Sequence, residues 1–493
     1  WNRYPGARCD SESFLYCLTF DKKMMQDWNW SGKYPEQPEI LRYLSHVADR
    51  FDLRRNMSFN TRVTGAHWDD VAGRWTVTTD QGDTVVCKWL ITGVGCLSST
   101  NMPNIKGRES FRGASYHTGA WPHEGVDFRG KRVGIIGTGS SGIQSIPVIA
   151  KTAGHLYVFQ RHPNYTVPAR HGTVTQESLA EVKRNYDAIM EKSKWSTGGS
   201  HYDPSTIPAM SVSDAEREAT YERAWEEGGF KFLVDTFADI AVDLEANKTA
   251  SDFIRRKITE IVKDPVVAKK LCPTDHPFAS KRPLIDTDYF DTYNRPNVTL
   301  VDLLEAPIDE ITPTGIRTTA ADYELDIIVF ATGFDAMTGT YNKIDIRGRG
   351  GRKLKDEWAA GPVTYLGVAT AGFPNMFMIT GPGSPSVLSN MPVSIEQHVE
   401  WISGVIDHMR RNGIASFEAS PQAQEQWVAH VNEVASQTLF MQSDSWYWGA
   451  NIPGKPRVFM PYAGGVGAYR QKCDEVAAAG YEGFALSKDT VPA

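Results

Sequence analysis

The residues with the clearest chemical potential form a glycine-rich turn from Gly137 to Gly142. An apolar run over residues 131–136 precedes this Gly-x-Gly-x-x-Gly pattern, and a helical pattern begins at Ile143. In this context the first glycine makes a tight turn, the second lets a pyrophosphate approach the backbone, and the third lets the helix pack on the strand. The phosphates then bind free N–H groups at the helix start. The turn therefore predicts a dinucleotide site, with a purely structural turn as the alternative.

The end of the next apolar run indicates which dinucleotide binds. Residues 156–159 are followed by Gln160, Arg161 and His162, and no Asp or Glu occurs from 155 to 165. An NAD site has an acid about 20 residues past the glycines, where it accepts from the ribose 2′-OH. A guanidinium instead suits a 2′-phosphate, which it binds bidentately. The sequence therefore favours NADP(H) over NAD(H), and a solvated surface arginine is the alternative.

Two further stretches carry unusual chemistry. Lys281 and Arg282 are adjacent and precede Pro283, and two such cations cannot both be buried without partners. The residues alone leave a surface turn as one interpretation. Near the C-terminus, residues 445–454 hold three aromatic residues among Gly and Pro. Such a loop is either rigidly packed or a mobile lid over a site.

Composition narrows the function classes. The chain has 493 residues, of which 41% are hydrophobic and 23% charged, so it can bury large cores in about two to four domains. The net charge of −7 argues against a nucleic-acid partner. An 18-residue apolar run and a signal peptide are both absent from the sequence, so no membrane association is predicted. The six scattered cysteines suggest a reduced, cytoplasmic protein without a metal site.

Periodic stretches predict the elements that position these residues. A helix is expected over 38–51, with Ile40, Leu41, Leu44 and Val47 on its buried face. Alternation over 75–89 predicts a hairpin. Residues 167–278 read as a helical insertion in the nucleotide domain, and Ser213 to Glu216 form a capping-box pattern. A strand over 326–330 ends in Ala-Thr-Gly, and a helix is expected from about Ser394.

The segment before the glycine turn identifies a family resemblance. Phe111, Gly113, His117, Trp121 and Pro122 match the fingerprint F-x-G-x-x-x-H-x-x-x-W-P. With the glycine turn directly downstream, the chain resembles the Baeyer–Villiger monooxygenases over nearly all of its length. The stretches RCDSES, GTGSSGIQ, ATGFDAMTG, GPGSPSVLSNM and NIPGKPRVFM bring it closest to the phenylacetone and steroid monooxygenase branch.

The resemblance implies an α/β fold with two Rossmann-like dinucleotide-binding domains, one for FAD and one for NADP. We expect the FAD domain over 1–98 and 332–493, the NADP domain over 99–166 and 279–331, and the helical insertion over 167–278. The implied reaction uses FAD, NADPH and O₂ to convert a ketone to an ester or lactone through a flavin peroxide. A bulky, aryl or polycyclic ketone is expected, and the protein is expected to be a cytoplasmic monomer.

The resemblance also assigns roles to individual residues. It implies that Arg282 stabilises the anions of the reaction, because an arginine stays protonated throughout, and that Asp10 pairs with Arg282. His117 is expected to link the domains during NADP movement. The implied cofactor-binding residues are Arg8, Cys9, Tyr16, Val63, Met391, Gly137, Thr138, Gly139, Ser140, Ser141, Gly142, Ile143, Gln144, Arg161, His162, Lys281 and Trp446.

Two features keep alternatives open. The family carries an earlier Gly-x-Gly-x-x-Gly for FAD, and none precedes Phe111 here, so we expect the first β-α-β unit to be missing. One alternative is therefore an inactive NADP-binding fragment. A flavin enzyme that oxidises sulfides or amines is the other, although Trp121, Pro122 and Arg282 argue against it.

Overall fold

The computed structural model describes residues 2–488, and its centre is a five-stranded parallel sheet in the order β10-β7-β6-β14-β5. Its strands are β5 (Ala114–His117), β6 (Arg132–Ile136), β7 (His155–Gln160), β10 (Val298–Asp302) and β14 (Ile327–Phe330). The register pairs Ile135 with Val158 on one side of β6 and Val133 with Ile327 on the other. The chain winds outward from β6 in both directions, so the strand order reverses between β6 and β14. Open α/β sheets bind ligands at such a reversal.

Both faces of this sheet are covered. Helix α3 (Ser140–Ala150) lies on one face, where Ile143, Ile146 and Ile149 are fully buried. The other face packs against an antiparallel meander of β11 (Ile308–Thr312), β12 (Gly315–Thr318) and β13 (Asp322–Glu324). A parallel sheet buried on two sides needs continuous apolar strands, as in the fully buried run of β14.

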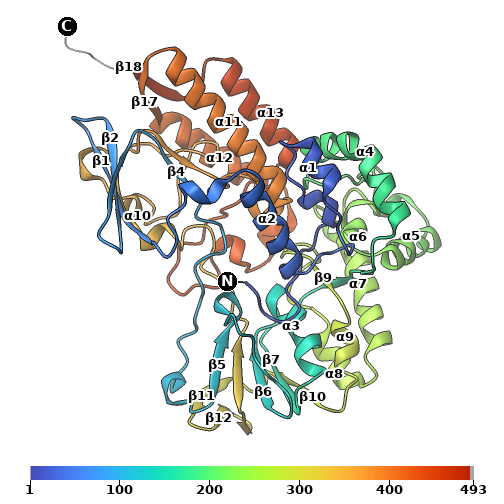
Figure 1. The fold of residues 1–493 in the computed structure, drawn as a ribbon. Helices are drawn as coiled ribbons and strands as arrows, with labels where there is room; N and C mark the ends of the chain where they lie inside the picture. The colour runs from blue at the N-terminus through green and yellow to red at the C-terminus, as the bar shows by residue number, and fades with distance from the viewer. Residues whose placement is uncertain (1, 489–493) are drawn as a thin grey trace.

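The helical insertion packs beside the sheet (Figure 1, green). Its helices are α4 (Gln176–Trp195), α5 (Asp214–Glu227), α6 (Lys231–Val234), α7 (Leu244–Ile261) and α8 (Pro265–Leu271). The expected capping box at the start of α5 is present, with Ser213 and Glu216 bonded to each other's backbone N–H. The parallel pair β8 (Thr166–Pro168) and β9 (Leu284–Asp286) stands where the chain enters and leaves the insertion.

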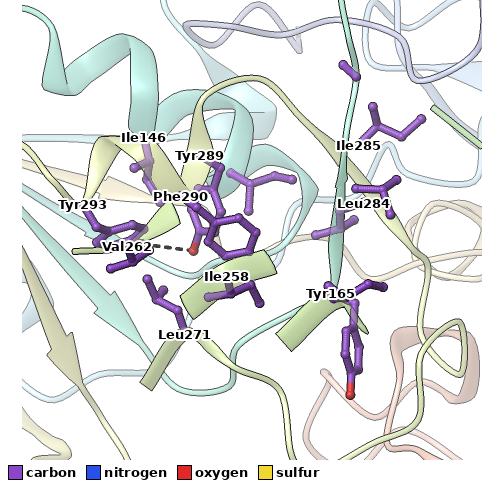
Figure 2. Close-up of a cluster of buried hydrophobic side chains, with 14 of the residues drawn as sticks. Ile146, Tyr165, Ile258, Val262, Leu271, Leu284, Ile285, Tyr289, Phe290 and Tyr293 are labelled. Carbon is purple, nitrogen blue, oxygen red and sulfur yellow. Dashed lines mark hydrogen bonds between the residues drawn. The ribbon is translucent and has the colours of Figure 1, made fainter. Parts of the chain in front are cut away.

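A continuous apolar core joins the insertion to the sheet. Figure 2 shows Ile258 and Val262 of α7 beside Leu271, with Tyr289, Phe290 and Tyr293 of the segment around α9 (Tyr289–Thr292) closing the cluster. The Tyr293 hydroxyl donates to the Tyr289 hydroxyl over 3.0 Å. This packing fixes the segment that runs from α8 into β9, on which two of the predicted site residues lie.

The remaining chain forms several small sheets and a helical layer (Figure 1, blue and orange to red). A four-stranded sheet has the order β15-β1-β2-β3, with the expected hairpin as β2 and β3; β4 pairs with β16, and β17 with β18. The strands are β1 (Val63–Asp69), β2 (Arg74–Thr79), β3 (Thr84–Cys87), β4 (Leu90–Thr92), β15 (Asp345–Arg347), β16 (Met376–Met378), β17 (Ile414–Ala419) and β18 (Phe484–Lys488). The helices are α1 (Lys22–Asp27), α2 (Gln37–Arg50), α10 (Leu354–Glu357), α11 (Met391–Arg411), α12 (Pro421–Ser436) and α13 (Val466–Ala478). The 3₁₀ turns are Ser13–Tyr16, Leu53–Asn56, Arg108–Ser110, Thr118–Ala120, Ala209–Ser211, Tyr341–Lys343, Arg349–Gly351, Ser386–Leu388, Leu439–Gln442 and Trp446–Trp448.

The buried face of α2 differs from the sequence expectation. Leu41 and Leu44 are 47% and 51% exposed, whereas Glu39, Tyr43 and Val47 are buried. Polar contacts set this orientation: Glu39 accepts from the backbone and hydroxyl of Ser31, and the Tyr43 hydroxyl accepts from a backbone N–H. Within residues 2–488, no helix combines the length and apolar character needed to cross a bilayer.

Candidate active site

The glycine turn joins β6 to α3 at the sheet edge where the strand order reverses. Gly137 has φ +108°, and a Cβ there would lie 2.5 Å from the Ala331 carbonyl oxygen. A Cβ on Gly142 would lie 2.3 Å from the Gly137 oxygen, so both positions require glycine. At Gly139, the N-cap of α3, a Cβ would meet nothing within 4 Å, and no side chain caps the helix. The first N–H groups of α3 are therefore open to a ligand.

The predicted cradle residues separate into two groups. Ser140, Ser141, Gly142 and Ile143 form the first turn of α3, and Thr138 precedes it and donates from its hydroxyl to the His162 carbonyl over 3.0 Å. Gln144 instead faces the N-terminal segment: its amide accepts from the Tyr4 hydroxyl over 2.8 Å and donates to the Arg8 carbonyl over 3.1 Å. Gln144 thereby connects the glycine turn to the segment that carries Asp10.

A cluster of basic side chains lies past the end of β7. Arg161 is exposed, and among the described residues no carboxylate lies within ion-pair distance of it. Lys281 is only 19% exposed, and burial lowers its pKa, an effect to which the positive charge of Arg161 adds. His162 also belongs to the cluster, and burial lowers its pKa below the ordinary value. Cations placed together without full compensation form a binding site for an anion.

Arg282 forms a half-buried ion pair with Asp10. Its Nε and Nη2 donate to Asp10 Oδ2 over 3.1 and 2.5 Å, and its Nη1 donates to the Val387 carbonyl over 2.7 Å. Burial lowers the pKa of Arg282, but the Asp10 carboxylate more than offsets this, so the pKa ends above its ordinary value. The side chain is still 24% exposed, so a charged guanidinium is held rigidly with part of its surface open.

Backbone pairing holds each partner of this ion pair. Cys9 N donates to the Pro35 carbonyl and Gln37 N to the Ala7 carbonyl, so the Asp10 segment runs along residues 33–37. Arg282 lies three residues after Ala279. Ala279 has a left-handed φ of +62°, a conformation that strains a residue with a Cβ. The pairing of β8 with β9 begins two residues after Arg282.

The aromatic C-terminal loop closes the site above Arg282. Trp446 and Tyr447 are in ring contact at 4.4 Å, and both pack with Met391 and Cys96 in one apolar cluster. Burial raises the pKa of Tyr447 to about 12, and Arg282 opposes that rise, which places the phenol beside the guanidinium. The Asn451 amide donates to the Phe334 carbonyl, and Lys455 contacts Asp335 over 2.6 Å. The loop is thus fastened to the segment that follows β14.

The other predicted cofactor residues lie at different distances from Arg282. Tyr16 is near the ion pair, because burial, Asp10 and Arg282 all act on its pKa, which is raised. Arg8 is engaged with Glu36 over 2.9 Å, and the Cys9 thiol donates to the Ser11 carbonyl. Val63 starts β1 in a different sheet, where it pairs with Thr79 and is 38% exposed.

The fingerprint residues lie on both sides of β5: Phe111 and Gly113 precede the strand, His117 ends it, and Trp121 and Pro122 follow it. A Cβ on Gly113 would lie 2.5 Å from both the Asp326 oxygen and the Phe111 ring, so only glycine fits between them. Trp121 is 3% exposed and packs on Tyr116 and Phe128, with Pro122 next in the chain. His117 ends β5; its Nδ1 accepts from Gly119 N over 3.0 Å, and its Nε2 lies 3.3 Å from the Thr332 hydroxyl.

Three residues of the site were missed by sequence reasoning. Tyr447 was treated only as part of an aromatic loop, yet it is 1% exposed beside Arg282. The Phe230 ring lies 5.9 Å from the Arg282 guanidinium, although Phe230 belongs to the helical insertion. Asp275 contacts the basic cluster from outside the stretch searched for an acid. No local pattern marks these residues, because long-range packing brings them to the site.

The residues present fit a nicotinamide dinucleotide, whereas toward FAD they offer a buried donor without the glycine turn that holds its pyrophosphate. For a nicotinamide dinucleotide, the open Gly139 position and the uncapped start of α3 offer the phosphate cradle, and Arg161 and Lys281 offer cations. For a flavin ring, the start of α11 offers a donor: Asn390 is 5% exposed and its amide Nδ2 lacks a hydrogen-bond partner. Asn390 lies three residues from Val387, whose carbonyl accepts from Arg282.

Comparisons with known proteins show which proteins the chain is similar to. A family model described as pyridine nucleotide-disulphide oxidoreductase matches residues 17–195. A protein of Pseudooceanicola batsensis described as a Baeyer-Villiger monooxygenase is 49% identical over 483 residues, covering 98% of this chain and 88% of that protein. A phenazine N-monooxygenase of Lysobacter antibioticus is 47% identical over 491 residues, covering 99% and 90%. A solved structure of oxidised steroid monooxygenase bound to NADP is 51% identical, with a TM-score of 0.94 and coverage of 99% and 92%.

Proposed function

The chain belongs to the Baeyer–Villiger monooxygenases, and from this premise we propose that Arg282 and Asp10 form its catalytic pair. The protein is an FAD- and NADPH-dependent monooxygenase that converts ketones and O₂ to esters or lactones. The bound cofactors supply the reducing equivalents and the activated oxygen. The observation that carries the proposal is the half-buried Arg282–Asp10 ion pair with its 2.5 Å contact, held under the aromatic loop.

Arg282 is suited to stabilise negative charge during oxygen insertion. A ketone that is attacked at its carbonyl carbon gains negative charge on its oxygen, and a fixed cation lowers the barrier to that change. Arg282 keeps its proton, because the Asp10 carboxylate raises its pKa by more than burial lowers it. Asp10 and the Val387 carbonyl fix the direction of the guanidinium. Tyr447 and Phe230 narrow the space beside it, so they are placed to affect which ketone fits.

The nucleotide half of the proposal places NADP(H) at the edge of the parallel sheet. The first turn of α3 would hold the pyrophosphate, and Arg161 with Lys281 would hold the 2′-phosphate. His117 would connect the end of β5 to Thr332 and, through the Thr332 hydroxyl, to the Asn101 carbonyl. This chain of contacts supports a role of His117 in linking the two nucleotide regions.

We also propose the domain boundaries, the cellular compartment and the oligomeric state of the protein. We propose an FAD domain over 1–98 and 332–493, an NADP domain over 99–166 and 279–331, and an insertion over 167–278. All six cysteines are free thiols, which supports a reducing compartment such as the cytoplasm. We propose a monomer that acts on bulky ketones, aryl or polycyclic; the similarity to a steroid monooxygenase supports this size range.

Product analysis tests the function. Purified protein supplied with FAD, NADPH and a set of aryl and polycyclic ketones is expected to consume O₂ and release esters or lactones. Arg282→Ala is expected to lower kcat by about 10²–10³-fold or more, as loss of a charge-stabilising donor does. Full activity in Arg282→Ala would contradict the assigned role of this residue.

Heteroatom oxidation is the second candidate. The 47% identity to a phenazine N-monooxygenase over 99% of this chain favours it. Offering a thioether and an N-heterocycle beside the ketones separates the two functions. N-oxide or sulfoxide as the only products would overturn ketone oxidation as the main activity.

A further inference from the structure

An acidic side chain lies among the basic residues proposed to bind the 2′-phosphate. Asp275 Oδ2 is 2.8 Å from His162 Nδ1 and 3.9 Å from Lys281 Nζ, and Asp275 Oδ1 is 2.6 Å from His276 Nδ1. The carboxylate thus contacts three of the basic side chains of this region at once.

The contacts of Asp275 divide into a firm one and two weak ones. His276 is buried, with its side chain only 2% exposed, and its hydrogen bond fixes one carboxylate oxygen. Toward the binding site the geometry is poor: the His162 nitrogen lies off the direction of a hydrogen bond, and the Lys281 contact is at the limit of an ion pair. The second oxygen therefore faces the Lys281 ammonium and the His162 imidazole without a strong bond to either.

The charges of Arg161, Lys281 and Asp275 together determine how strongly this region attracts an anion. Arg161 and Lys281 carry two positive charges, and Asp275 removes one of them from the field that a phosphate meets. The Asp275 side chain is 38% exposed, so solvent and ligand both reach it. A doubly charged phosphate bound to Lys281 would stand beside this carboxylate, and like charges in contact oppose binding.

The geometry points to Asp275 as an internal counter-ion that occupies Lys281 and His162 in the free protein and weakens binding of the 2′-phosphate. Asp275 then sets how strongly the protein prefers NADP(H) to NAD(H), because only NADP(H) carries the phosphate that the carboxylate opposes. This inference rests on the proposed NADP site. It adds a specificity-determining residue that lies outside the glycine turn and outside the end of β7.

Equilibrium binding to the full-length protein tests the counter-ion directly. Titration calorimetry with NADP⁺ and NAD⁺ is performed on the unaltered chain and on Asp275→Asn, which removes the charge and keeps an acceptor for His276. Asp275→Asn is expected to bind NADP⁺ about fivefold more tightly, the scale of one partly exposed charge contact, with NAD⁺ affinity unchanged. Asp322, on β13, forms an exposed ion pair with Arg317 on β12. Asp322→Asn therefore removes an equal charge outside the proposed site and is expected to change neither affinity.

The outcomes are distinguishable. Unchanged or weaker NADP⁺ binding in Asp275→Asn, with NAD⁺ binding retained, overturns the counter-ion and leaves the NADP site intact. Loss of both nucleotides would indicate damage to the fold, and Asp275→Ser, which also removes the charge, then decides by the same ratio of affinities. An unaltered protein that binds NAD⁺ as tightly as NADP⁺ would overturn the proposed 2′-phosphate site itself.

Discussion

Lys281 and Arg282 are neighbours in the chain, yet they meet their aspartates in opposite ways. Arg282 contacts Asp10, 272 positions away, at 2.5 Å and with two donors. Lys281 contacts Asp275, six positions away, at 3.9 Å. The Arg282–Asp10 pair holds its guanidinium in one orientation, whereas the Lys281–Asp275 contact leaves the ammonium available to bind a ligand. The difference shows that a cation held by two hydrogen bonds to one carboxylate oxygen keeps a fixed orientation, whereas a cation with a distant partner keeps its donors available for a ligand.

The largest expected effect comes from breaking the tight pair. Asp10→Asn removes the charge that fixes Arg282, so the guanidinium loses its orientation toward the substrate. We expect kcat for NADPH-dependent ketone oxidation to fall by about 10²–10³-fold. Asp127→Asn, in the exposed pair with Arg129, is the matched control and should retain full turnover. Equal turnover in both variants would show that Arg282 needs no anchor.

Asp286 offers a third case, because among the described residues no basic side chain forms an ion pair with it. Asp286 is buried on β9, where it accepts from the Thr166 hydroxyl and from Tyr289 N, and burial raises its pKa to about 6. A carboxyl whose pKa is raised on folding stabilises the protein most when protonated. That contribution is fully present below about pH 4 and is lost as the pH rises through about 6.

Replacing this carboxyl by an amide should remove the pH-dependent loss. Asp286→Asn keeps an acceptor for Tyr289 N and cannot ionise. Relative to the unaltered protein, its free energy of unfolding is expected to rise between pH 4 and pH 8 by up to about 3 kcal/mol. Thermal unfolding at several pH values measures this, with Asp83→Asn, an exposed acid of the turn between β2 and β3, as the control. A difference that stays constant with pH would contradict a raised pKa.

Breaking the loose pair from the cation side should affect binding rather than turnover. Lys281→Met is expected to weaken NADP⁺ binding by about 10–30-fold, the scale of one charge-assisted contact of about 1.5–2 kcal/mol, and to leave NAD⁺ binding unchanged. Lys106→Met removes an equal charge from an exposed pair with Glu310 and serves as the control. Equal weakening of NAD⁺ binding would place Lys281 away from the 2′-phosphate.

The smallest effect is expected for His162, the uncharged member of the basic cluster past the end of β7. Burial lowers the pKa of His162, so the imidazole is uncharged at pH 8 and offers the phosphate little attraction. His162→Asn should therefore change NADP⁺ affinity at pH 8 by less than about threefold, which titration calorimetry resolves. A tenfold loss would mean that His162 holds the phosphate as firmly as Lys281 does.

Local patterns predicted the parts of the fold whose residues are close in sequence. The strand, glycine turn and helix around Gly137, the hairpin of β2 and β3, and the cap at Ser213 are all present, because each depends on a few neighbouring residues. The buried face of α2 was predicted correctly at Val47 and wrongly at Leu41 and Leu44, since polar contacts of Glu39 and Tyr43 decide the orientation of the helix.

The site was predictable only as far as family resemblance carried it. Nothing in the spacing of residues 10 and 282 indicates that they touch, and their pairing was inferred from the resemblance. Phe230 and Asp275 come from the insertion. The helical periodicity of the insertion predicts which of its residues pack in its own core, but it does not predict which of its loops contact the rest of the protein. Such contacts depend on packing across 50 or more residues, which no short pattern encodes.

The adjacency of Lys281 and Arg282 also limits how nucleotide preference can change during evolution or engineering. One peptide unit separates the two side chains, and the strained backbone at Ala279 and the start of β9 confine that unit from both ends. A substitution that moves the backbone at Lys281 therefore moves Arg282 with it. Arg161 lies past the end of a different strand, so under the proposed NADP site we expect its exchange to alter nucleotide choice while the Arg282–Asp10 pair is preserved.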